Sequence, residues 1–257
     1  MKINLQPGKK IYFASDFHLG FPSPEESVVR EKLIIKWLDD IKKDAQHIFL
    51  LGDIFDFWFE YKFVVPKGFI RFLGKLAELI DSGITITFFT GNHDLWMFDY
   101  FEKELGIKVY YKPTSVLIDQ THFHLAHGDG LGPGDTGYKL LKLVFTNKLC
   151  QWLFGVLNPN IGMWFALKWS TGKKHRKMSK GLKFYGEKEF IFIYCKEIEA
   201  KTHHDFYLMG HRHIPYELEV NPNSKYINIG DWVENNTYSV FDGKKVELLT
   251  YKNSVTA

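Results

Sequence analysis

Short runs of apolar, β-branched and aromatic residues recur along the chain, and each run ends abruptly in glycine or polar residues. This pattern is typical of buried strands that lead into loops. It occurs at residues 11–15, 47–51, 84–90, 122–126, 206–209 and 226–229. We therefore predict a buried strand at each of these places, followed by a polar loop.

Helical spacing of apolar residues separates the first of these strands. It covers residues 25–42 and residues 67–82, and the second segment closes near Gly83. A further helix is predicted over residues 185–201, and the tail from 226 to 251 resembles short antiparallel strands joined at Asp242-Gly243. The alternation favours an α/β fold in which a mixed sheet, or two packed sheets, lies between helices.

The polar residues that follow the six strands are of a restricted kind. They are Asp16-Phe17-His18, Gly52-Asp53, Gly91-Asn92-His93-Asp94, His127-Gly128-Asp129, Gly210-His211-Arg212-His213 and Gly230-Asp231. Ligands of open α/β sheets bind beyond the carboxyl ends of the strands. We therefore expect these clusters to form one site, although they are far apart in the sequence.

Carboxylates, imidazoles and one amide in such clusters are suited to divalent cations. An extended backbone through Asp16 and His18 would point both side chains to the same side, where one metal can bind both. No thiolate is offered, so zinc held by cysteine is excluded, whereas Mn, Fe, Co and His/Asp-bound zinc remain open. Glycine before Asp53 allows close backbone approach, and the two oxygens of Asp53 can bridge two ions. A capping Asp or a surface His explains any one cluster, but the ordered set favours a metal site.

Composition narrows the class of protein. With 257 residues, 45% of them hydrophobic and 17% aromatic, the chain can bury one sizeable core, as one domain with an insertion or two small domains. A net charge of +3 gives no general reason to expect nucleic acid. Cys150 and Cys195 are too few for a disulfide framework, which favours a reducing compartment. We find no signal-peptide pattern and no apolar run long enough to span a bilayer, and expect a cytoplasmic protein.

The segment 136–186 departs from the rest of the chain in charge. It holds ten Lys/Arg residues and no Asp or Glu, which leaves 23 basic against 30 acidic residues elsewhere. Leu, Trp and Phe recur in it at spacings of three or four, with a break at Asn158-Pro159-Asn160. We predict a helical insertion with an apolar and a basic side. Either it binds lipid and an anionic membrane, or its apolar stripe packs on the core and its lysines are solvated.

The ordered motifs DxH, GD, GNHD, HGD and GHRH resemble those of the calcineurin-like metallophosphoesterase superfamily, over almost the whole chain except the insertion. The resemblance implies a four-layer sandwich, in which two mixed β-sheets are flanked by helices and a di-metal centre lies at the strand ends. It also implies two ligand sets that share Asp53, and Mn²⁺ is the metal we expect. One set is Asp16, His18, Asp53 and His213, and the other is Asp53, Asn92, His127 and His211.

Two-metal sites of this kind activate water for attack on phosphorus, so no protein nucleophile is needed. His93 adjoins a ligand without being required as one. We expect it to stabilise the phosphoryl charge or protonate the leaving oxygen, with Asp94 orienting it. A simple hydrogen-bonding role for His93 is the alternative.

Within the superfamily, the closest resemblance is to the UDP-2,3-diacylglucosamine hydrolases of lipid A biosynthesis, which release UMP and 2,3-diacylglucosamine 1-phosphate. It rests on the run from Gly52 to Trp58 and on HGDG followed by Asp135, Gly137 and Tyr138. The resemblance implies that Trp58, Asp135 and Tyr138 line the substrate site, together with Asn92, and that residues 136–186 form a lid. We expect the substrate or an anionic membrane to contact the basic residues Lys173, Lys174, Arg176 and Lys177.

His93 departs from the best-known branch of these hydrolases, which has arginine at this position. The departure leaves open a divergent branch, or a phosphodiesterase or pyrophosphatase that acts on a soluble nucleotide. A non-catalytic scaffold is a further alternative, but such scaffolds usually lose ligands and this chain keeps all seven. Our expectation is a monomer at the cytoplasmic face of the inner membrane that binds no nucleic acid.

Overall fold

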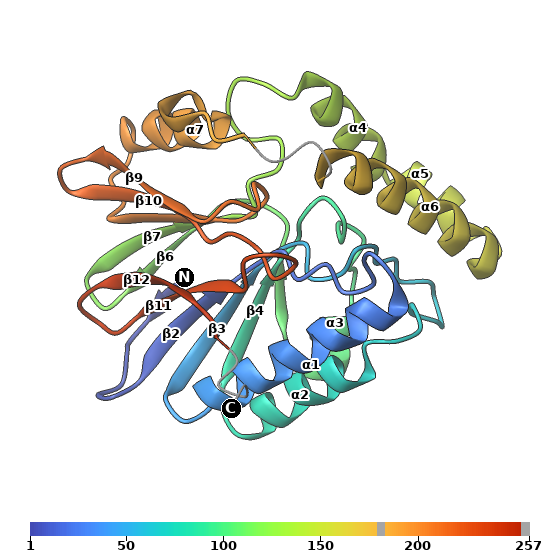
Figure 1. Cartoon of the computed structure of the whole chain (residues 1–257), viewed down its shortest axis with the longest axis horizontal. Coiled ribbons are helices and arrows are strands. Elements are labelled where there is room, and N and C mark those ends of the chain that lie inside the picture. Colours follow the sequence, from blue (N-terminus) through green and yellow to red (C-terminus); the bar gives the residue numbers. More distant parts are fainter. Residues whose placement is uncertain (179–182, 253–257) are drawn as a thin grey trace.

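Two mixed β-sheets lie face to face between two layers of helices (Figure 1). The computed structural model describes the backbone of residues 1–178 and 183–252, and the side chains of residues 1–168 and 183–252. Each sheet has six strands. This four-layer arrangement confirms the fold class predicted from the sequence.

The first sheet has the strand order β12-β11-β2-β3-β4-β5. Strands β2 to β5 are parallel, and β11 runs antiparallel to β2 and β12. The bounds are β2 Lys10–Ala14, β3 Ala45–Leu51, β4 Thr85–Phe89, β5 Lys108–Tyr110, β11 Thr237–Phe241 and β12 Val246–Thr250.

The second sheet has the order β1-β6-β7-β8-β10-β9, and its strands β7, β8 and β10 are parallel. The bounds are β1 Lys2–Ile3, β6 Thr114–Ile118, β7 Thr121–Leu125, β8 Phe206–Met209, β9 Tyr216–Asn221 and β10 Ser224–Asn228. Apolar side chains from both sheets, among them Phe13, Phe49, Phe123 and Leu208, form the core between them. The strands that precede the six polar clusters thus lie at the centre of the sandwich.

Helices α1 (Pro24–Ile41), α2 (Ile70–Asp81) and α3 (Tyr100–Leu105) cover the outer face of the first sheet, and α7 (Phe190–Glu199) covers the second (Figure 1). Helix α1 begins where Ser23 accepts a hydrogen bond from the backbone N–H of Glu26, with Pro24 in the first turn. Its residues Ile34, Trp37, Leu38 and Ile41 are buried, as their spacing predicts.

Two predicted elements differ from the structure. The helix predicted from residue 185 starts only at Phe190, because a single 3₁₀ turn, Gly186–Lys188, precedes it. The tail agrees in part: β11 and β12 form the predicted antiparallel hairpin joined at Asp242-Gly243 in the first sheet, whereas β10 lies in the second sheet, parallel to β8 and antiparallel to β9. The chain changes sheets through residues 229–236, where Gly230 and Asn236 adopt positive φ angles.

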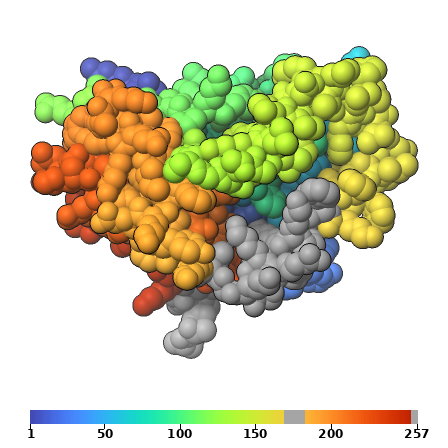
Figure 2. All heavy atoms as spheres, turned by 90° about the horizontal axis from the view of Figure 1, so that it is seen from above, coloured from blue at the N-terminus to red at the C-terminus, as the bar shows by residue number. Residues whose placement is uncertain are grey.

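The insertion contains helices α4 (Thr136–Thr146), α5 (Lys148–Gly155) and α6 (Pro159–Met178), which lie above the strand ends (Figure 1). From above, α4 (yellow-green) lies across this face between α7 (orange) and the yellow helices α5 and α6 (Figure 2). Phe154 packs on Phe59 and Trp96, and the Trp96 indole donates to the Phe145 carbonyl oxygen at 2.7 Å. The division of the chain into a main domain and a lid stays a prediction. No helix in the described part is long and apolar enough to cross a membrane.

Candidate metal centre

Five strands end at one edge of the sandwich, and the loops after them bring the seven predicted ligands together. Asp16, His18, Asp53 and Asn92 follow strands β2, β3 and β4 of the first sheet. His127, His211 and His213 follow β7 and β8 of the second sheet. The site therefore spans both sheets, as expected for the carboxyl ends of parallel strands.

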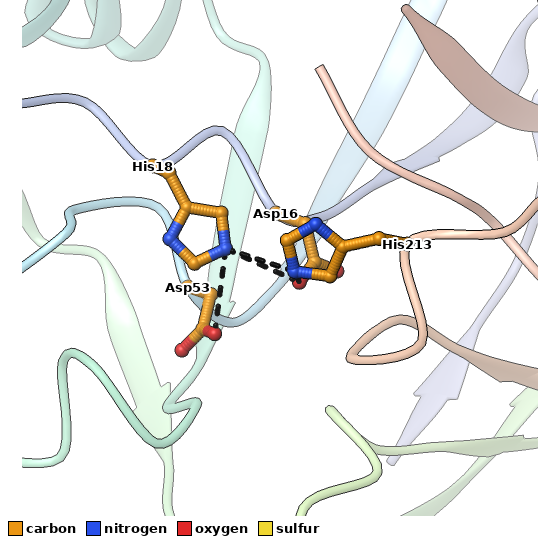
Figure 3. A group of neighbouring side chains, drawn as sticks. All are labelled: Asp16, His18, Asp53 and His213. Carbon is orange, nitrogen blue, oxygen red and sulfur yellow. Dashed lines mark hydrogen bonds and ion pairs between the residues drawn. The ribbon is translucent and has the colours of Figure 1, made fainter. Parts of the chain in front are cut away.

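The first group consists of Asp16, His18, Asp53 and His213 (Figure 3). His18 Nε2 lies 3.6 Å from an oxygen of Asp16 and 3.6 Å from Asp53 Oδ2. His213 Nε2 lies 3.1 Å from Asp16 Oδ1 and 3.1 Å from His18 Nε2. Ligands bound at about 2.1 Å and at right angles to one another are roughly 3 Å apart, so this spacing fits one cation.

The second group consists of Asp53, His127 and His211, and the ligand atoms lie within 4.8 Å of one another. Asp53 Oδ2, which contacts His18 in the first group, also lies 3.4 Å from His127 Nε2. One carboxylate oxygen is thus placed between the two groups, where it can bridge two cations. Asn92 follows Gly91. A Cβ atom at position 91 would overlap Asp53 Oδ1. A side chain at position 91 would therefore displace the shared carboxylate.

The backbone at these ligands differs from our prediction. Asp16 and His18 do not lie on extended backbone, because their φ angles are 54° and 43°. Asp53, His211 and His213 adopt the same left-handed conformation, with φ angles of 52°, 67° and 58°. Asp and His tolerate this region better than most residues, but it still costs free energy. Tight left-handed turns, and not strand alternation, therefore bring each pair of ligands to the same side.

Several ligand atoms fit a cation better than a hydrogen-bond donor. Among the described residues, Asp16 Oδ1, Asn92 Oδ1 and His127 Nε2 are buried without a hydrogen-bond partner. His127 Nδ1 donates to the Leu51 carbonyl oxygen at 2.8 Å, so Nε2, which lies 3.4 Å from Asp53 Oδ2, is the nitrogen that would bind a cation in exchange for its proton. A buried polar atom without a partner is costly, and a bound cation would remove that cost.

Electrostatics support the same interpretation. Burial raises the pKa of Asp53, but the neighbouring His127 and His93 outweigh it and hold the pKa well below its usual value. Burial also raises the pKa of Asp16, but His213 and His18 outweigh burial and hold this pKa well below its usual value. His127 responds in the opposite direction: burial lowers its pKa, yet Asp53 raises it to about 10. The carboxylates thus remain charged and draw positive charge into the site.

Residues outside the two groups hold the ligands in position. Asp231, which is 2% exposed, accepts a hydrogen bond from His213 Nδ1 at 3.0 Å, and Asp56 Oδ1 lies 3.4 Å from His18 Nδ1. The buried guanidinium of Arg30 donates to the carbonyl oxygens of Phe17, His18 and Phe21. Sequence reasoning gave these three residues no role. Of the three, only Asp231 could have been identified from the sequence pattern, because it follows the end of a strand as the predicted ligands do.

His93 lies at the edge of the site, with Nε2 4.0 Å from Asp53 Oδ2. Its Nδ1 is 2.8 Å from the Asp56 carbonyl oxygen and 3.7 Å from Asp56 Oδ1. Asp56, and not the predicted Asp94, therefore orients the ring. Asp94 instead accepts hydrogen bonds from the backbone N–H groups of Gly91 and Ile54, and burial beside Asp53 raises its pKa to about 7. The Asp94 carboxyl group thus connects the loop after β3, which contains Asp53, with the loop after β4, which contains Asn92.

The predicted substrate residues differ in their burial and in their contacts with the HGD loop. Trp58 is 0% exposed and donates its indole N–H to Glu60, so it belongs to the core and does not line an open site. Asp135 is exposed at the start of α4. Tyr138 donates its hydroxyl to Asp129 Oδ2, which also binds Lys142 Nζ, both at 2.6 Å. The side chains of Lys173, Lys174, Arg176 and Lys177 lie outside the described residues.

Comparison with known proteins agrees with this geometry. The family model of the calcineurin-like phosphoesterases matches residues 9–215. The chain belongs to this family. A protein of Porphyromonas gingivalis named UDP-2,3-diacylglucosamine hydrolase is 36% identical over 252 residues, which cover 93% of this chain and 96% of that protein. A Shewanella baltica protein of the same name is 24% identical over 222 residues, covering 86% and 89% of the two chains.

A solved phosphoesterase structure, Yfce of E. coli, is 16% identical to this calcineurin-like phosphoesterase. The aligned region covers 94% of this chain and 92% of the Yfce chain, with a TM-score of 0.46.

Proposed function

We propose that this protein hydrolyses the pyrophosphate bond of UDP-2,3-diacylglucosamine to give UMP and 2,3-diacylglucosamine 1-phosphate, a step of lipid A biosynthesis. The observation that carries the proposal is the relative of that name, whose 36% identity extends over 96% of its own length. The two ligand groups that share Asp53 support hydrolysis at phosphorus. Ligand sets of oxygen and imidazole nitrogen suit Mn²⁺, which we propose as the metal.

The chemistry follows from the residues that would hold two cations. Asp16, His18, Asp53 and His213 form the first set, and Asp53, Asn92, His127 and His211 the second. Bound there, two cations would lower the pKa of a water molecule and neutralise charge on a phosphoryl oxygen. The amide of Asn92 adds no negative charge to a site that must also accept a diphosphate.

His93 is the candidate for proton transfer. Its Nδ1 faces the Asp56 carbonyl oxygen, which accepts a hydrogen bond and thereby places the Nδ1 proton on that side. Nε2 then points toward the shared carboxylate, at the edge where substrate would enter. In the imidazolium form, which carries a second proton on Nε2, we assign His93 to donate to the phosphoryl oxygen or to protonate the leaving group. Asp56 positions it.

The lipid part of the substrate is assigned to the insertion. Helices α4 to α6 lie above the strand ends, and Tyr138 and Lys142 of α4 both contact the Asp129 carboxylate of the HGD loop. We propose that this segment closes over the diacyl sugar, and that its basic residues 173–177 bind the anionic inner membrane as a peripheral contact. The protein would act as a monomer at the cytoplasmic face.

A soluble nucleotide is the second candidate substrate. It is favoured by the burial of Trp58, which removes one predicted substrate contact, and by His93 in place of arginine. The deciding assay offers the purified protein, with Mn²⁺, UDP-2,3-diacylglucosamine and UDP-N-acetylglucosamine in parallel. Strong preference for the diacyl substrate is expected, and equal turnover of the two would refute the lipid assignment.

The assay needs a variant that separates the metal centre from contaminating activity. Asp53→Ala removes the shared carboxylate and should abolish hydrolysis of both substrates together with metal binding. Asp81→Ala, an exposed residue at the end of α2, is the matched control and should behave as the natural protein does. Residual metal-dependent turnover by Asp53→Ala would contradict the bridging role.

A further inference from the structure

An arginine stands between the two histidines of residues 210–213, which we call the GHRH loop. Arg212 donates from Nε and Nη2 to the two carboxylate oxygens of Glu189, at 2.8 and 3.1 Å. The side chain of Glu189 is 4% exposed and that of Arg212 is 17% exposed, so the ion pair is largely removed from water. Two hydrogen bonds between a guanidinium and a carboxylate fix orientation as well as distance. The pair therefore restrains the GHRH loop at its middle residue.

Helix α7 holds the other end of this ion pair in place. Glu189 directly precedes the helix, whose residues Ile191 and Phe192 are buried against the second sheet (Figure 1). The Glu189 carboxylate also accepts a hydrogen bond from the backbone N–H of Tyr185 at 3.0 Å, and the N-terminus of a helix favours an anion. Loss of Arg212 would leave this buried carboxylate without its counterion, which is costly. Glu189 is thus a fixed point to which the loop is attached.

The backbone of the GHRH loop requires contacts that hold it. His211 and His213 have left-handed φ angles of 67° and 58°, and strained residues keep such a conformation where their surroundings impose it. The backbone N–H of His211 donates to Asp16 Oδ2 at 2.9 Å, and the Asn235 side chain donates to the His213 carbonyl oxygen at 3.0 Å. Arg212 adds a contact between these two.

The same arginine connects the metal centre with the end of the insertion. Arg212 Nη2 also donates to the Lys183 carbonyl oxygen at 2.9 Å. At the beginning of the insertion, Lys142 of α4 lies 2.6 Å from the Asp129 carboxylate of the HGD loop. The HGD and GHRH loops, which carry the ligands from the second sheet, are thus each attached to one end of the insertion.

We propose that Arg212 is a positioning residue, which through Glu189 holds His211 and His213 at the spacing that two cations require. Because these histidines belong to different ligand groups, loss of the ion pair should weaken both metal-binding events. Asp231, by contrast, accepts from His213 and therefore acts on one event. The inference rests on the two proposed ligand sets and is independent of the diacyl substrate.

A double-mutant cycle in the full chain tests the inference. Metal-free Arg212→Gln, Glu189→Gln and the variant with both changes are titrated with Mn²⁺ by calorimetry. Each single change should weaken both binding events about tenfold, the lower end of the loss for residues that orient a metal-binding histidine. The double variant should bind no more weakly than the single variants, because both changes break the same pair. Arg212→Lys keeps the charge without the two parallel hydrogen bonds, so its affinities should lie between those of Arg212→Gln and the natural protein.

The matched control is Lys225→Gln, which removes the cation of the exposed ion pair between Lys225 and Glu217, 2.8 Å apart. It should bind Mn²⁺ as the natural protein does. Urea unfolding of the metal-free proteins measures stability separately, and Arg212→Lys provides the same comparison if Arg212→Gln does not fold. A lower free energy of unfolding with unchanged Mn²⁺ affinities would overturn the inference, because the pair would then be merely structural.

Two further results would also overturn the inference: losses that multiply in the double variant, and a loss confined to one binding event. A natural protein without two Mn²⁺-binding events would refute the ligand sets and the inference with them. If the variants lose affinity as expected but the natural protein does not hydrolyse UDP-2,3-diacylglucosamine, the proposed substrate is refuted and the role of Arg212 stands.

Discussion

Asp231→Asn should impair the metal centre more than its small size suggests. Asp231 Oδ1 accepts hydrogen bonds from the backbone N–H groups of Glu234 and Asn235 and from the Asn235 side chain, at 3.0–3.1 Å. These three donors would keep the amide oxygen of the new asparagine at the Oδ1 position. The amide NH₂ then faces His213 Nδ1, so that the ring must accept there and carry its proton on Nε2. A protonated Nε2 cannot bind a cation.

The expected loss can be bounded from the contact itself. Removing a residue that orients a metal-binding histidine costs about 10–100-fold in metal affinity, or roughly 1.4–2.7 kcal/mol. We expect Asp231→Asn at the upper end, because it enforces the wrong tautomer. Asp231→Ala should be milder, because it leaves Nδ1 free to donate to water. Calorimetric titration of the metal-free protein with Mn²⁺ measures the effect, and one of the two binding events should weaken, since His213 belongs to one ligand group.

The control is Asp242→Asn, the same chemical change at an exposed turn whose carboxylate accepts the backbone N–H groups of Lys244 and Lys245. It should titrate like the natural protein. The reasoning is refuted if Asp231→Asn binds within threefold of the natural protein, or if the alanine variant is the weaker of the two.

Three further predictions follow from the same geometry. His93→Ala should retain two bound metals by elemental analysis and lower kcat by roughly 10²–10⁴; loss of metal would make His93 a ligand. Gly91→Ala should displace Asp53, weakening both metal-binding events and destabilising the fold by roughly 1–3 kcal/mol in urea unfolding, and unchanged titration would contradict the overlap. Burial lowers the pKa of His47 to about 4 in the folded protein, below its ordinary value of 6.5. Between these two pH values the unfolded chain binds a proton at His47 and the folded protein does not, so the free energy of unfolding falls as the pH drops from 6.5 toward 4. In urea unfolding at both pH values, His47→Gln should remove up to about 3 kcal/mol of this acid-induced loss of stability, whereas His122→Gln at an exposed position should leave the loss unchanged.

The fold was largely predictable because its signals are local. Continuous apolar runs such as residues 47–51 mark strands buried on both faces, and β3 spans Ala45–Leu51 as observed. The pattern did not predict α3, β5 and β6, nor the two edge strands of the second sheet: β1 has two residues, and β9 alternates apolar and charged side chains. Such segments form because a neighbouring strand supplies hydrogen bonds, which their own sequence does not reveal.

The candidate site was predictable in its residues but not in its geometry. The clusters after the strands identified Asp16, His18 and their partners, because all lie at carboxyl ends that must converge. Their left-handed backbone, with φ of 54° at Asp16, depends on tertiary contacts such as the Arg30 guanidinium that binds the following carbonyl groups. For the same reason, sequence reasoning attributed to Asp94 the orienting contact that Asp56 makes across the loop.

The origin of the ligands in both sheets has a consequence for folding. Four of the seven proposed ligands follow strands of the first sheet and three follow strands of the second, so neither sheet alone completes a site. Cations held there would cross-link the two halves of the sandwich, in addition to the apolar core between them. At a thousandfold excess over the dissociation constant, one such cation adds about 4 kcal/mol to the free energy of unfolding. Metal supply would thus set how firmly the two sheets dock, and chelation should first loosen amide protection along their shared interface.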